Sequence, residues 1–391
     1  MRNRLLAAAI TGLAATPVAA QEGPEVSWFG FAQIAAETTD EDETGDGGGV
    51  KFAADRIRIG NIARWGNGVH SKLQVDFNAS GISTEENDQG LLESASNTNQ
   101  LPNIIKDAVV GYRVNDNLDI QAGMRKMPVG MDFNTSGKKL DIPKRSMEKD
   151  LVLERSAGAF LFGQAGRAGS RLGYALAVAN PATRSGAVDP GAGECFIADA
   201  GAPGEVNEPG APGEDNSYAG RLSYQAGQAL YAEGYYGTST TSCTAGNAED
   251  YQVYGVGLRS QPTSRLTLKA EWIQGANVQH VDGRDRDVWY VHGGYMLNPG
   301  LEAVIRHYNS SYEGGSVDAD LGETWFNANF FLAPEARHQA RIQLSLVLPR
   351  GDTEASDYGG NAPDQFHRTA LNFDKDGDAE TTFLAQFQAA F

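Results

Sequence analysis

Arginines at alternating positions are the first feature of this sequence that could do chemistry. Arg56, Arg58 and Arg64 share one parity of their segment. Ile57 and Ile59 occupy the other parity. Spacing by two places the arginines on one face of a strand and the isoleucines on the opposite face. Because a guanidinium offers paired donors to phosphate or carboxylate oxygens, such a row predicts a surface that attracts anions.

Further cations occupy the same parity of other candidate strands: Lys72, Arg113, Arg125, Arg171, Arg221, Arg259, Arg265, Lys269, Arg306 and Arg341. Acidic residues at that parity are fewer: Asp76, Asp107, Asp119, Glu233, Glu271 and Glu302. If this parity lines a narrow, low-dielectric passage, its net positive charge raises the local concentration of anions. The alternative is that these cations only solvate a polar interior or pair with acids across strands.

One long segment, residues 127–157, is also rich in cations. They are Lys138, Lys139, Lys144, Arg145, Lys149 and Arg155. Folded into a wide barrel, the segment would narrow the passage and set its size limit. A solvated surface loop of mixed charge is equally compatible with this composition.

The elements that must position these residues are predicted to be sixteen strands. They begin near residues 26, 51, 69, 104, 118, 158, 170, 217, 229, 251, 264, 287, 300, 323, 338 and 380. Short turns such as residues 66–68 follow even-numbered strands, and long segments such as 80–102 and 181–216 follow odd-numbered ones. This rhythm is typical of an all-β, sixteen-stranded antiparallel transmembrane barrel with short periplasmic turns and long extracellular loops.

The chain ends on an amphipathic strand. Phe383, Phe387 and Phe391 share one parity, and Thr382 and Gln386 occupy the other. This strand resembles the assembly signal, closed by Phe391, that the barrel-assembly machinery uses for bacterial outer-membrane proteins. It predicts that lipid covers one face of the wall and water the other. A soluble sandwich also alternates, but its apolar faces would have to meet in a shared core.

The N-terminus predicts export. Two arginines precede the apolar run 5–13, and small residues lead up to Ala20. This is the pattern of a signal peptide, residues 1–20, cut after Ala20. The apolar run has about half of the ~20 residues that a spanning helix needs. Residues 21–391 are then predicted to form one barrel in the bacterial outer membrane, in contact with lipid and lipopolysaccharide.

The net charge is −18, which argues against nucleic acid as a partner. The surplus carboxylates lie in segments such as 40–43, 205–215 and 374–380. Because these segments fall between the candidate strands, a negative total is compatible with a positive interior.

Two weaker signals lie in the loops. Export makes a disulfide between Cys195 and Cys243 plausible, with two free thiols as the alternative. Carboxylates also alternate, as in calcium loops, at four positions: Asp374, Asp376, Asp378 and Glu380. The spacing of an EF-hand is incomplete, so a hydrated acidic loop is the favoured interpretation.

Catalysis is not indicated. The six histidines are scattered, and no Gly-x-Ser-x-Gly motif occurs. An enzyme would need a nucleophile and a base, or clustered carboxylates, presented together. No cofactor is expected. A receptor barrel closed by its loops stays open as an alternative.

Several segments resemble the phosphate-selective porin O and P family. They are Asp-Ala-Val-Val-Gly-Tyr at 107–112, Ala-Gly-Met-Arg-Lys-Met-Pro-Val-Gly-Met at 122–131, Thr-Ser-Gly-Lys at 135–138 and Glu-Arg-Ser at 154–156. Residues 56–60 and 72–77 are similar to the early Arg-rich strand of that family and the segment after it. The resemblance implies a trimeric sixteen-stranded channel whose third long loop folds into the pore.

The sequence thus predicts a porin for passive diffusion of small hydrophilic solutes, with a preference for anions such as phosphate. A non-selective or cation-tolerant porin is the alternative. The residues predicted to line the pore and set its selectivity are Arg56, Arg58, Arg64, Lys72, Arg113, Arg125, Lys138, Lys139, Lys144 and Arg145.

Overall fold

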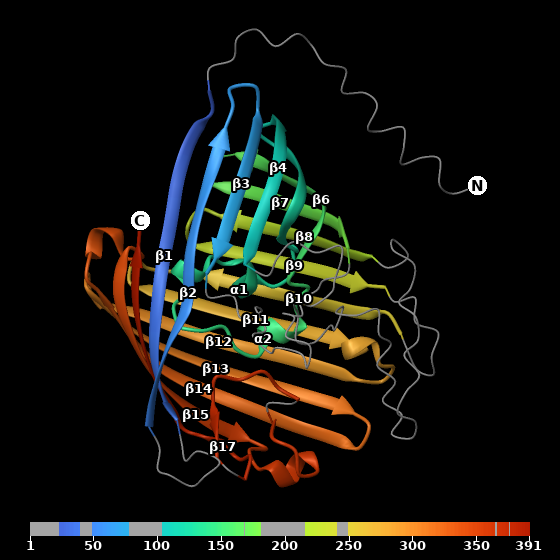
Figure 1. The fold of residues 1–391 in the computed structure, drawn as a ribbon, viewed down its shortest axis with the longest axis vertical. Coiled ribbons are helices and arrows are strands. Elements are labelled where there is room, and N and C mark those ends of the chain that lie inside the picture. The colour runs from blue at the N-terminus through green and yellow to red at the C-terminus, as the bar shows by residue number, and fades with distance from the viewer. Residues whose placement is uncertain are drawn as a thin grey trace, which may run out of the picture.

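Sixteen strands of the described chain close into one antiparallel barrel (Figure 1). The computed structural model describes residues 23–39, 49–77, 104–167, 169–180, 216–240, 249–363, 366–374 and 376–391. The strands are β1 (Glu25–Thr39), β2 (Gly49–Arg64), β3 (Val69–Asp76), β4 (Ile105–Asn115), β5 (Leu118–Lys126), β6 (Arg155–Arg167), β7 (Ser170–Ala179), β8 (Ser217–Ala226), β9 (Leu230–Ser239), β10 (Tyr251–Ser260), β11 (Leu266–Ala276), β12 (Asp285–Asn298), β13 (Leu301–Gly314), β14 (Val317–Phe331), β15 (Ala340–Gly351) and β18 (Thr382–Ala390). The fold predicted from alternation is confirmed.

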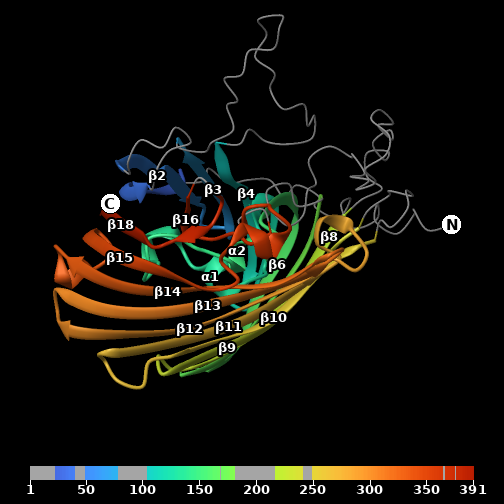
Figure 2. The same cartoon turned by 90° about the horizontal axis from the view of Figure 1, so that it is seen from below.

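Short helices and one small hairpin lie between the strands. They are α1 (Met131–Asn134), η1 (Gly137–Lys139), α2 (Glu148–Leu151), η2 (Val278–His280), η3 (Pro334–Ala336), η4 (Ala355–Tyr358), and the paired strands β16 (Asn372–Phe373) and β17 (Ala379–Glu380). Figure 2 shows α1 and α2 inside the curved wall of strands. No helix in the described ranges is long and apolar enough to cross a membrane.

The alternation of short and long connections holds along most of the chain, but the connection β14–β15 (residues 332–339) is as long as β11–β12 (residues 277–284), and β13–β14 is short. Between β13 and β14 the sequence predicts a longer loop and a strand start near residue 323, but β14 begins at Val317 after a two-residue turn. Along this added stretch Ala319 and Leu321 are buried, whereas Asp318 and Asp320 are exposed. At this end of the wall the apolar side chains therefore point inward and the polar ones outward. A search for strands with an apolar exterior misses this stretch of β14.

Elsewhere the wall has an apolar exterior and a polar interior. The outward side chains of Val110 and Leu222 are 63% and 61% exposed. Gln33, Arg306 and Gln343 point inward and are fully buried. This is the arrangement expected for a barrel whose exterior contacts hydrocarbon.

A β-bulge in β2 changes which side chains face the interior. Gln33 pairs with Arg56, but the next residue of β1 pairs with Ala54, so Asp55 has no partner in the register. Both consecutive side chains bond inward groups: Arg56 donates to Gln33 at 2.6 Å, and Asp55 accepts from Gln386 at 2.6 Å. Bulges commonly redirect side chains in this way.

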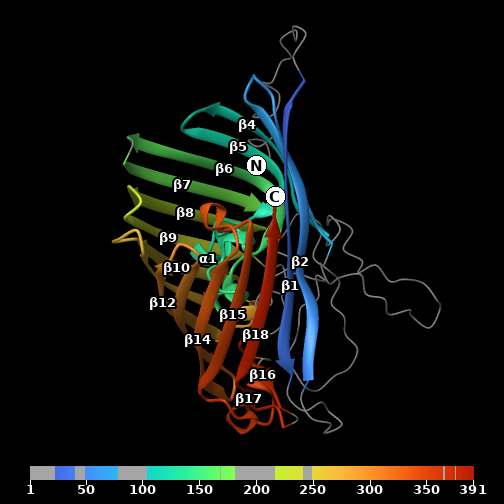
Figure 3. The same cartoon turned by 90° about the vertical axis from the view of Figure 1, so that its left-hand side faces the viewer.

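The last residue closes the ring (Figure 3). The backbone N–H of Phe391 donates to the carbonyl of Gly30 at 3.0 Å, and the reverse bond measures 3.2 Å. A Cβ on residue 30 would lie 2.6 Å from the Phe391 ring and 2.9 Å from the backbone carbonyl oxygen of Arg58, and the backbone cannot move aside as a side chain can, which favours glycine here. The role of Phe391 as an assembly signal stays a prediction.

Two sequence predictions lie outside the described residues. One is the signal peptide, residues 1–20, with its cleavage after Ala20. The other is the disulfide between Cys195 and Cys243.

Candidate permeation path and the loop that borders it

Residues 127–154, here called the inner loop, fold into the barrel (Figure 2). Their apolar side chains, among them Met127, Val129 and Leu153, are fully buried. They form one cluster with inward side chains of the wall such as Tyr251. Close packing of this kind fixes a loop in one position, because each packed side chain has few other conformations that avoid a clash.

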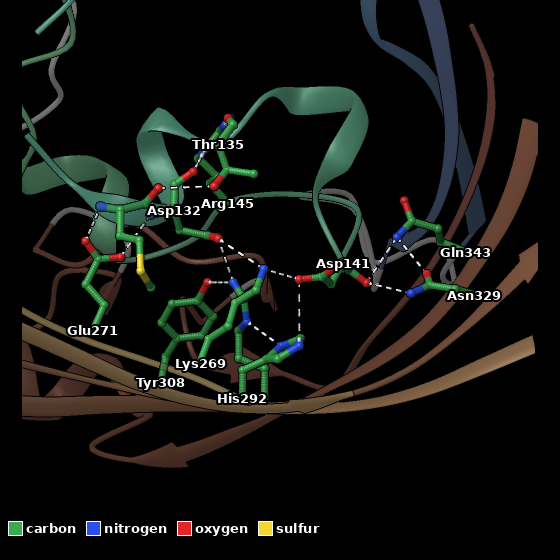
Figure 4. A network of polar contacts seen from close by, with 12 residues as sticks. Asp132, Thr135, Asp141, Arg145, Lys269, Glu271, His292, Tyr308, Asn329 and Gln343 are labelled. Carbon is green, nitrogen blue, oxygen red and sulfur yellow. Dashed lines mark hydrogen bonds and ion pairs between the residues drawn. The ribbon is translucent and has the colours of Figure 1, made fainter. Parts of the chain in front are cut away.

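Glu271 of β11 holds the start of α1 (Figure 4). Its carboxylate accepts hydrogen bonds from the backbone N–H groups of Met131 at 2.5 Å and Asp132 at 3.1 Å. The Tyr235 hydroxyl donates to the same carboxylate at 2.9 Å. The first N–H groups of a helix lack partners within it, so Glu271 satisfies two of them.

The Asp132 carboxylate forms a buried ion pair with Arg306 of β13 at 2.9 Å. Arg306 also donates to the Tyr308 hydroxyl at 2.7 Å and to His292 at 3.2 Å. Burial alone would raise the pKa of Asp132, but Arg306 and Lys269 outweigh it and lower that pKa to about 2. The carboxylate is therefore ionised at neutral pH, and Arg306 depends on it for compensation.

Asp141 joins the inner loop to three strands (Figure 4). Its carboxylate pairs with Lys269 of β11. Its backbone carbonyl accepts hydrogen bonds from the side-chain amides of Asn327 and Asn329, both at 3.0 Å, and of Gln343 at 3.2 Å. Burial would raise the pKa of Asp141, but Lys269 holds it well below its usual range.

The anchorage continues around the wall to β18 and β2. Gln388 donates to the backbone carbonyl of Lys138 at 3.1 Å. Gln386 and Arg56 donate to the carbonyl of Pro143 at 3.3 Å and 3.4 Å. The inner loop is therefore fixed along an arc that runs from β9 through β15 and β18 to β2.

A second segment, residues 352–363, 366–374 and 376–381, here called the last loop, contacts the inner loop at α2. Asp150 of α2 accepts hydrogen bonds from Arg286 of β12 at 2.6 Å and from the backbone N–H of Arg368 at 2.8 Å. One carboxylate thus ties the inner loop to the wall and to the last loop. Charged groups that share a buried partner stabilise each other's position.

Glu148 differs from the other buried carboxylates of the inner loop. Its Oε2 accepts from the backbone N–H of Ser146 at 3.1 Å, and its Oε1 has no hydrogen-bond partner among the residues that the structure describes. Burial, together with the nearby charge of Asp132, raises the pKa of Glu148 to about 7. Its ionisation near neutral pH therefore opposes the packing of the loop.

The side of the interior that faces β2–β6 stays open. A cavity of about 530 Å³, here called the cationic cavity, lies between these strands and residues 134–138 of the inner loop. Eight basic side chains line it: Arg58, Arg64, Lys72, Arg113, Arg125, Lys126, Lys138 and Arg155. Asp107 and Asp119 are the two carboxylates in its described lining.

Part of this positive charge is paired within the wall. Arg58 bonds Asp76 at 2.8 Å, and Lys72 bonds Asp107 at 2.5 Å. Arg155 approaches the same Asp107 at 3.4 Å. Five cations of the lining form no ion pair with any described residue: Arg64, Arg113, Arg125, Lys126 and Lys138. Because no carboxylate pairs with them, their charge is available to a mobile anion.

Six of the ten residues predicted to set selectivity line this cavity: Arg58, Arg64, Lys72, Arg113, Arg125 and Lys138. The other four lie outside its lining. Arg56 bonds the wall and Pro143, Lys144 pairs with Glu37, and Arg145 donates to backbone carbonyls of the inner loop. Lys139 is exposed.

Two cations of the lining were not predicted to set selectivity. Lys126 follows Arg125 and is the last residue of β5. At the end of a strand the alternation of inward and outward side chains stops, so parity does not predict where Lys126 points. Arg155 begins β6, although the sequence places it among the loop cations. The basic pair 125–126 at a strand end is the signal that could have identified Lys126.

The acidic segment near the C-terminus does not assemble as a calcium site. Asp374 Oδ1 accepts hydrogen bonds from the backbone N–H groups of Asp376 and Asp378, both at 2.9 Å. In the described part of the chain no three His, Cys, Asp or Glu side chains gather in a group that could hold a metal ion. The hydrated acidic loop, which includes Glu380, is the better interpretation.

The geometry has relatives among known proteins. The anion-selective porin from Comamonas acidovorans superposes with a TM-score of 0.61 at 12% identity, over 94% of this chain and 100% of that one. The outer membrane channel DcaP of Acinetobacter baumannii gives 0.58 at 12% identity, over 94% and 98%. The trimer form of OmpT, an outer membrane protein of Vibrio cholerae, gives 0.55 at 10% identity, over 95% and 100%. At sequence identities this low, the structural likeness shows the fold alone.

Sequence comparison supplies the family. No curated protein matches the chain. The family model described as phosphate-selective porin O and P matches residues 28–304, which is more than half of the chain. The chain therefore belongs to the phosphate-selective porin O and P family and is an outer-membrane β-barrel porin, a passive diffusion channel without enzymatic activity.

Proposed function

We propose that this porin passes small anions in preference to cations through the cationic cavity. The observation that carries the proposal is the lining itself, with eight basic side chains against two carboxylates. Fixed positive charge in a passage with low-dielectric walls lowers the energy of an entering anion and raises that of a cation. Phosphate is one such anion, as the family description suggests.

The inner loop is proposed to set the size limit of the channel. The support for this proposal is that the inner loop is anchored to the wall from β9 to β2. The space beside β2–β6 is then the route left for solutes among the described residues. A loop fixed by buried ion pairs and apolar packing gives a constant diameter, because releasing it would expose both.

The main alternative is a non-selective or cation-tolerant porin. It would hold if the ion pairs of Arg58 and Lys72 cancelled most of the positive charge in the lining. Five cations of the same lining have no ion-pair partner among the described residues, which favours the anion-preferring channel.

The assembly and export of the protein are also proposals. A homotrimer in lipid and lipopolysaccharide is supported by the trimer form of the structurally similar OmpT. Export by a signal peptide cut after Ala20, insertion by the barrel-assembly machinery and a Cys195–Cys243 disulfide rest on the sequence pattern.

Reversal potentials in planar bilayers test the proposal. The mature protein is inserted between unequal potassium chloride solutions, and the chloride-to-potassium permeability ratio is measured. We expect a ratio above one that falls toward one as salt screens the fixed charges. A ratio at or below one at low salt would support the cation-tolerant alternative.

A further inference from the structure

We infer that the cationic cavity takes organic anions with an apolar body, such as aromatic carboxylates, in preference to small inorganic anions of the same charge. The inference rests on the proposed anion preference and names the solute class within it. It is carried by the non-charged part of the lining, which anion selectivity alone does not require.

Six apolar side chains belong to the lining: Phe29, Phe31, Ile62, Trp65, Val69 and Val109. All but the last come from β1–β3 and the β2–β3 turn. Four of the eight basic side chains come from β4–β6: Arg113, Arg125, Lys126 and Arg155. The apolar side chains of the cavity, whose volume is about 530 Å³, are therefore concentrated on β1–β3, where Arg58, Arg64 and Lys72 lie on the same strands, and the strands β4–β6 contribute mainly charge.

Arg58 and Lys72 lie next to aromatic rings of the lining. The Arg58 guanidinium carbon lies 5.6 Å from the centre of the Phe31 ring, and the Lys72 Nζ lies 5.8 Å from the centre of the Phe29 ring. Each cation also pairs with a wall carboxylate. A solute carboxylate that shares either cation with this partner lies next to an aromatic ring, which its apolar body can contact. Contact between aromatic groups contributes beyond the burial of area alone.

Small inorganic anions gain less from this lining. Phosphate or chloride next to Phe29 and Trp65 loses water without gaining hydrogen bonds there, which costs free energy. An anion with an apolar body keeps its charged end near the cations and removes apolar surface from water at the other end. The volume falls within the range of roughly 300–1,000 Å³ typical of small-molecule sites, so such a molecule fits.

Block of chloride current tests the inference on the wild-type channel. Sodium benzoate, sodium acetate and inorganic phosphate are each added to one side of a bilayer that carries a single channel. We expect benzoate to halve the chloride current at about one tenth of the acetate concentration, since one additional ring contact corresponds to about tenfold in affinity. Because both probes carry one carboxylate, charge cannot produce the difference.

The variant Phe29→Ala tests the site. Phe29 is half-buried in the cavity lining, and we expect its removal to abolish most of the advantage of benzoate over acetate. The control is Phe326→Ala, because Phe326 is exposed on the outer face of β14. In Phe326→Ala the benzoate advantage and the chloride-to-potassium ratio should both stay as in the wild type, because this change lies outside the cavity and alters no charge.

Equal block by benzoate and acetate would overturn the inference, and so would a benzoate advantage that persists in Phe29→Ala. The first comparison needs no variant and holds whether or not Phe29→Ala folds. A chloride-to-potassium ratio at or below one would instead overturn the proposed anion preference. The two failures are therefore distinguishable.

Discussion

The two sides of the barrel interior use the same kind of residue differently. On the side filled by the inner loop, inward cations pair with loop carboxylates: Arg306 with Asp132, Lys269 with Asp141 and Arg286 with Asp150. On the side of β2–β6, Arg64 and Arg113 have no ion-pair partner among the described residues. The inward cations that pair with loop carboxylates hold the loop, whereas those of the cavity lining either pair with carboxylates of the wall or have no ion-pair partner among the described residues.

Energetics reinforce this division. A charge buried on the loop-filled side needs its partner, because an isolated buried ion is costly. On the open side water and mobile anions solvate the cations, so each of them contributes little to folding. Changes on the loop-filled side should therefore alter the structure of the channel, and changes on the open side its selectivity.

The largest effect is expected from Asp132→Asn. The variant leaves Arg306 buried without its charge partner, which costs about 3–5 kcal/mol. The start of the inner loop should detach, so single-channel currents should become larger and noisier. The control is Asp119→Asn on the open side, whose single-channel currents should show no added noise. Quiet currents of wild-type size in Asp132→Asn would show that this pair does not hold the loop.

The next largest effect concerns selectivity. In Arg58→Glu with Arg113→Glu, the lining changes from eight cations and two carboxylates to six and four. The chloride-to-potassium permeability ratio should fall by about threefold or more at low salt. Arg56→Glu should lower it less, because Arg56 lies outside the cavity lining. If Arg56→Glu lowered the ratio as much as the double change, the passage would have to lie next to Arg56 as well. If neither change altered the ratio, none of these arginines would line the passage.

A smaller, pH-dependent effect is expected from Glu148→Gln. Because the folded protein raises this pKa from 4.5 to about 7, its contribution to stability is complete below about pH 4.5 and is lost as the pH rises through 7. The glutamine resembles the protonated acid at every pH. The variant should therefore melt a few degrees above the wild type at pH 8 and at the same temperature at pH 4. Circular dichroism in detergent measures both, and a difference that is larger at pH 4 would refute the assignment.

The smallest effect is expected from Lys144→Gln. Lys144 pairs with Glu37, but both side chains are partly exposed, so the pair contributes less than about 1 kcal/mol. The melting temperature should change by at most a few degrees and the permeability ratio should stay the same. A large fall in the ratio would place Lys144 on the passage.

Much of the fold could be predicted because the wall obeys one rule. Hydrocarbon outside and water inside impose alternation on each strand, and turn residues separate the strands. The rule fails where β13 and β14 extend to residues 314 and 317, since Leu321 there packs inward and Asp320 faces outward. Residues 317–321 still alternate, but their apolar side chains point inward, so a rule that assigns apolar side chains to the exterior does not extend the strand to them.

The candidate site could be predicted only in part. Parity correctly places Arg58, Lys72 and Arg113 in one lining, because a strand fixes the side of each residue. It cannot place Arg145, whose position depends on how the inner loop folds. Nor can parity show that Arg306 pairs with Asp132, 174 residues apart in the sequence.

Modification of introduced cysteines tests most directly whether ions pass along the open side. In a background with Cys195→Ser and Cys243→Ser, Arg113→Cys is compared with Asn329→Cys, which is fully buried beneath the inner loop. An anionic methanethiosulfonate reagent should rapidly reduce the current through Arg113→Cys and leave Asn329→Cys unchanged. Equal modification of both, or modification of Asn329→Cys alone, would contradict the division of the interior into an anchored and a conducting side.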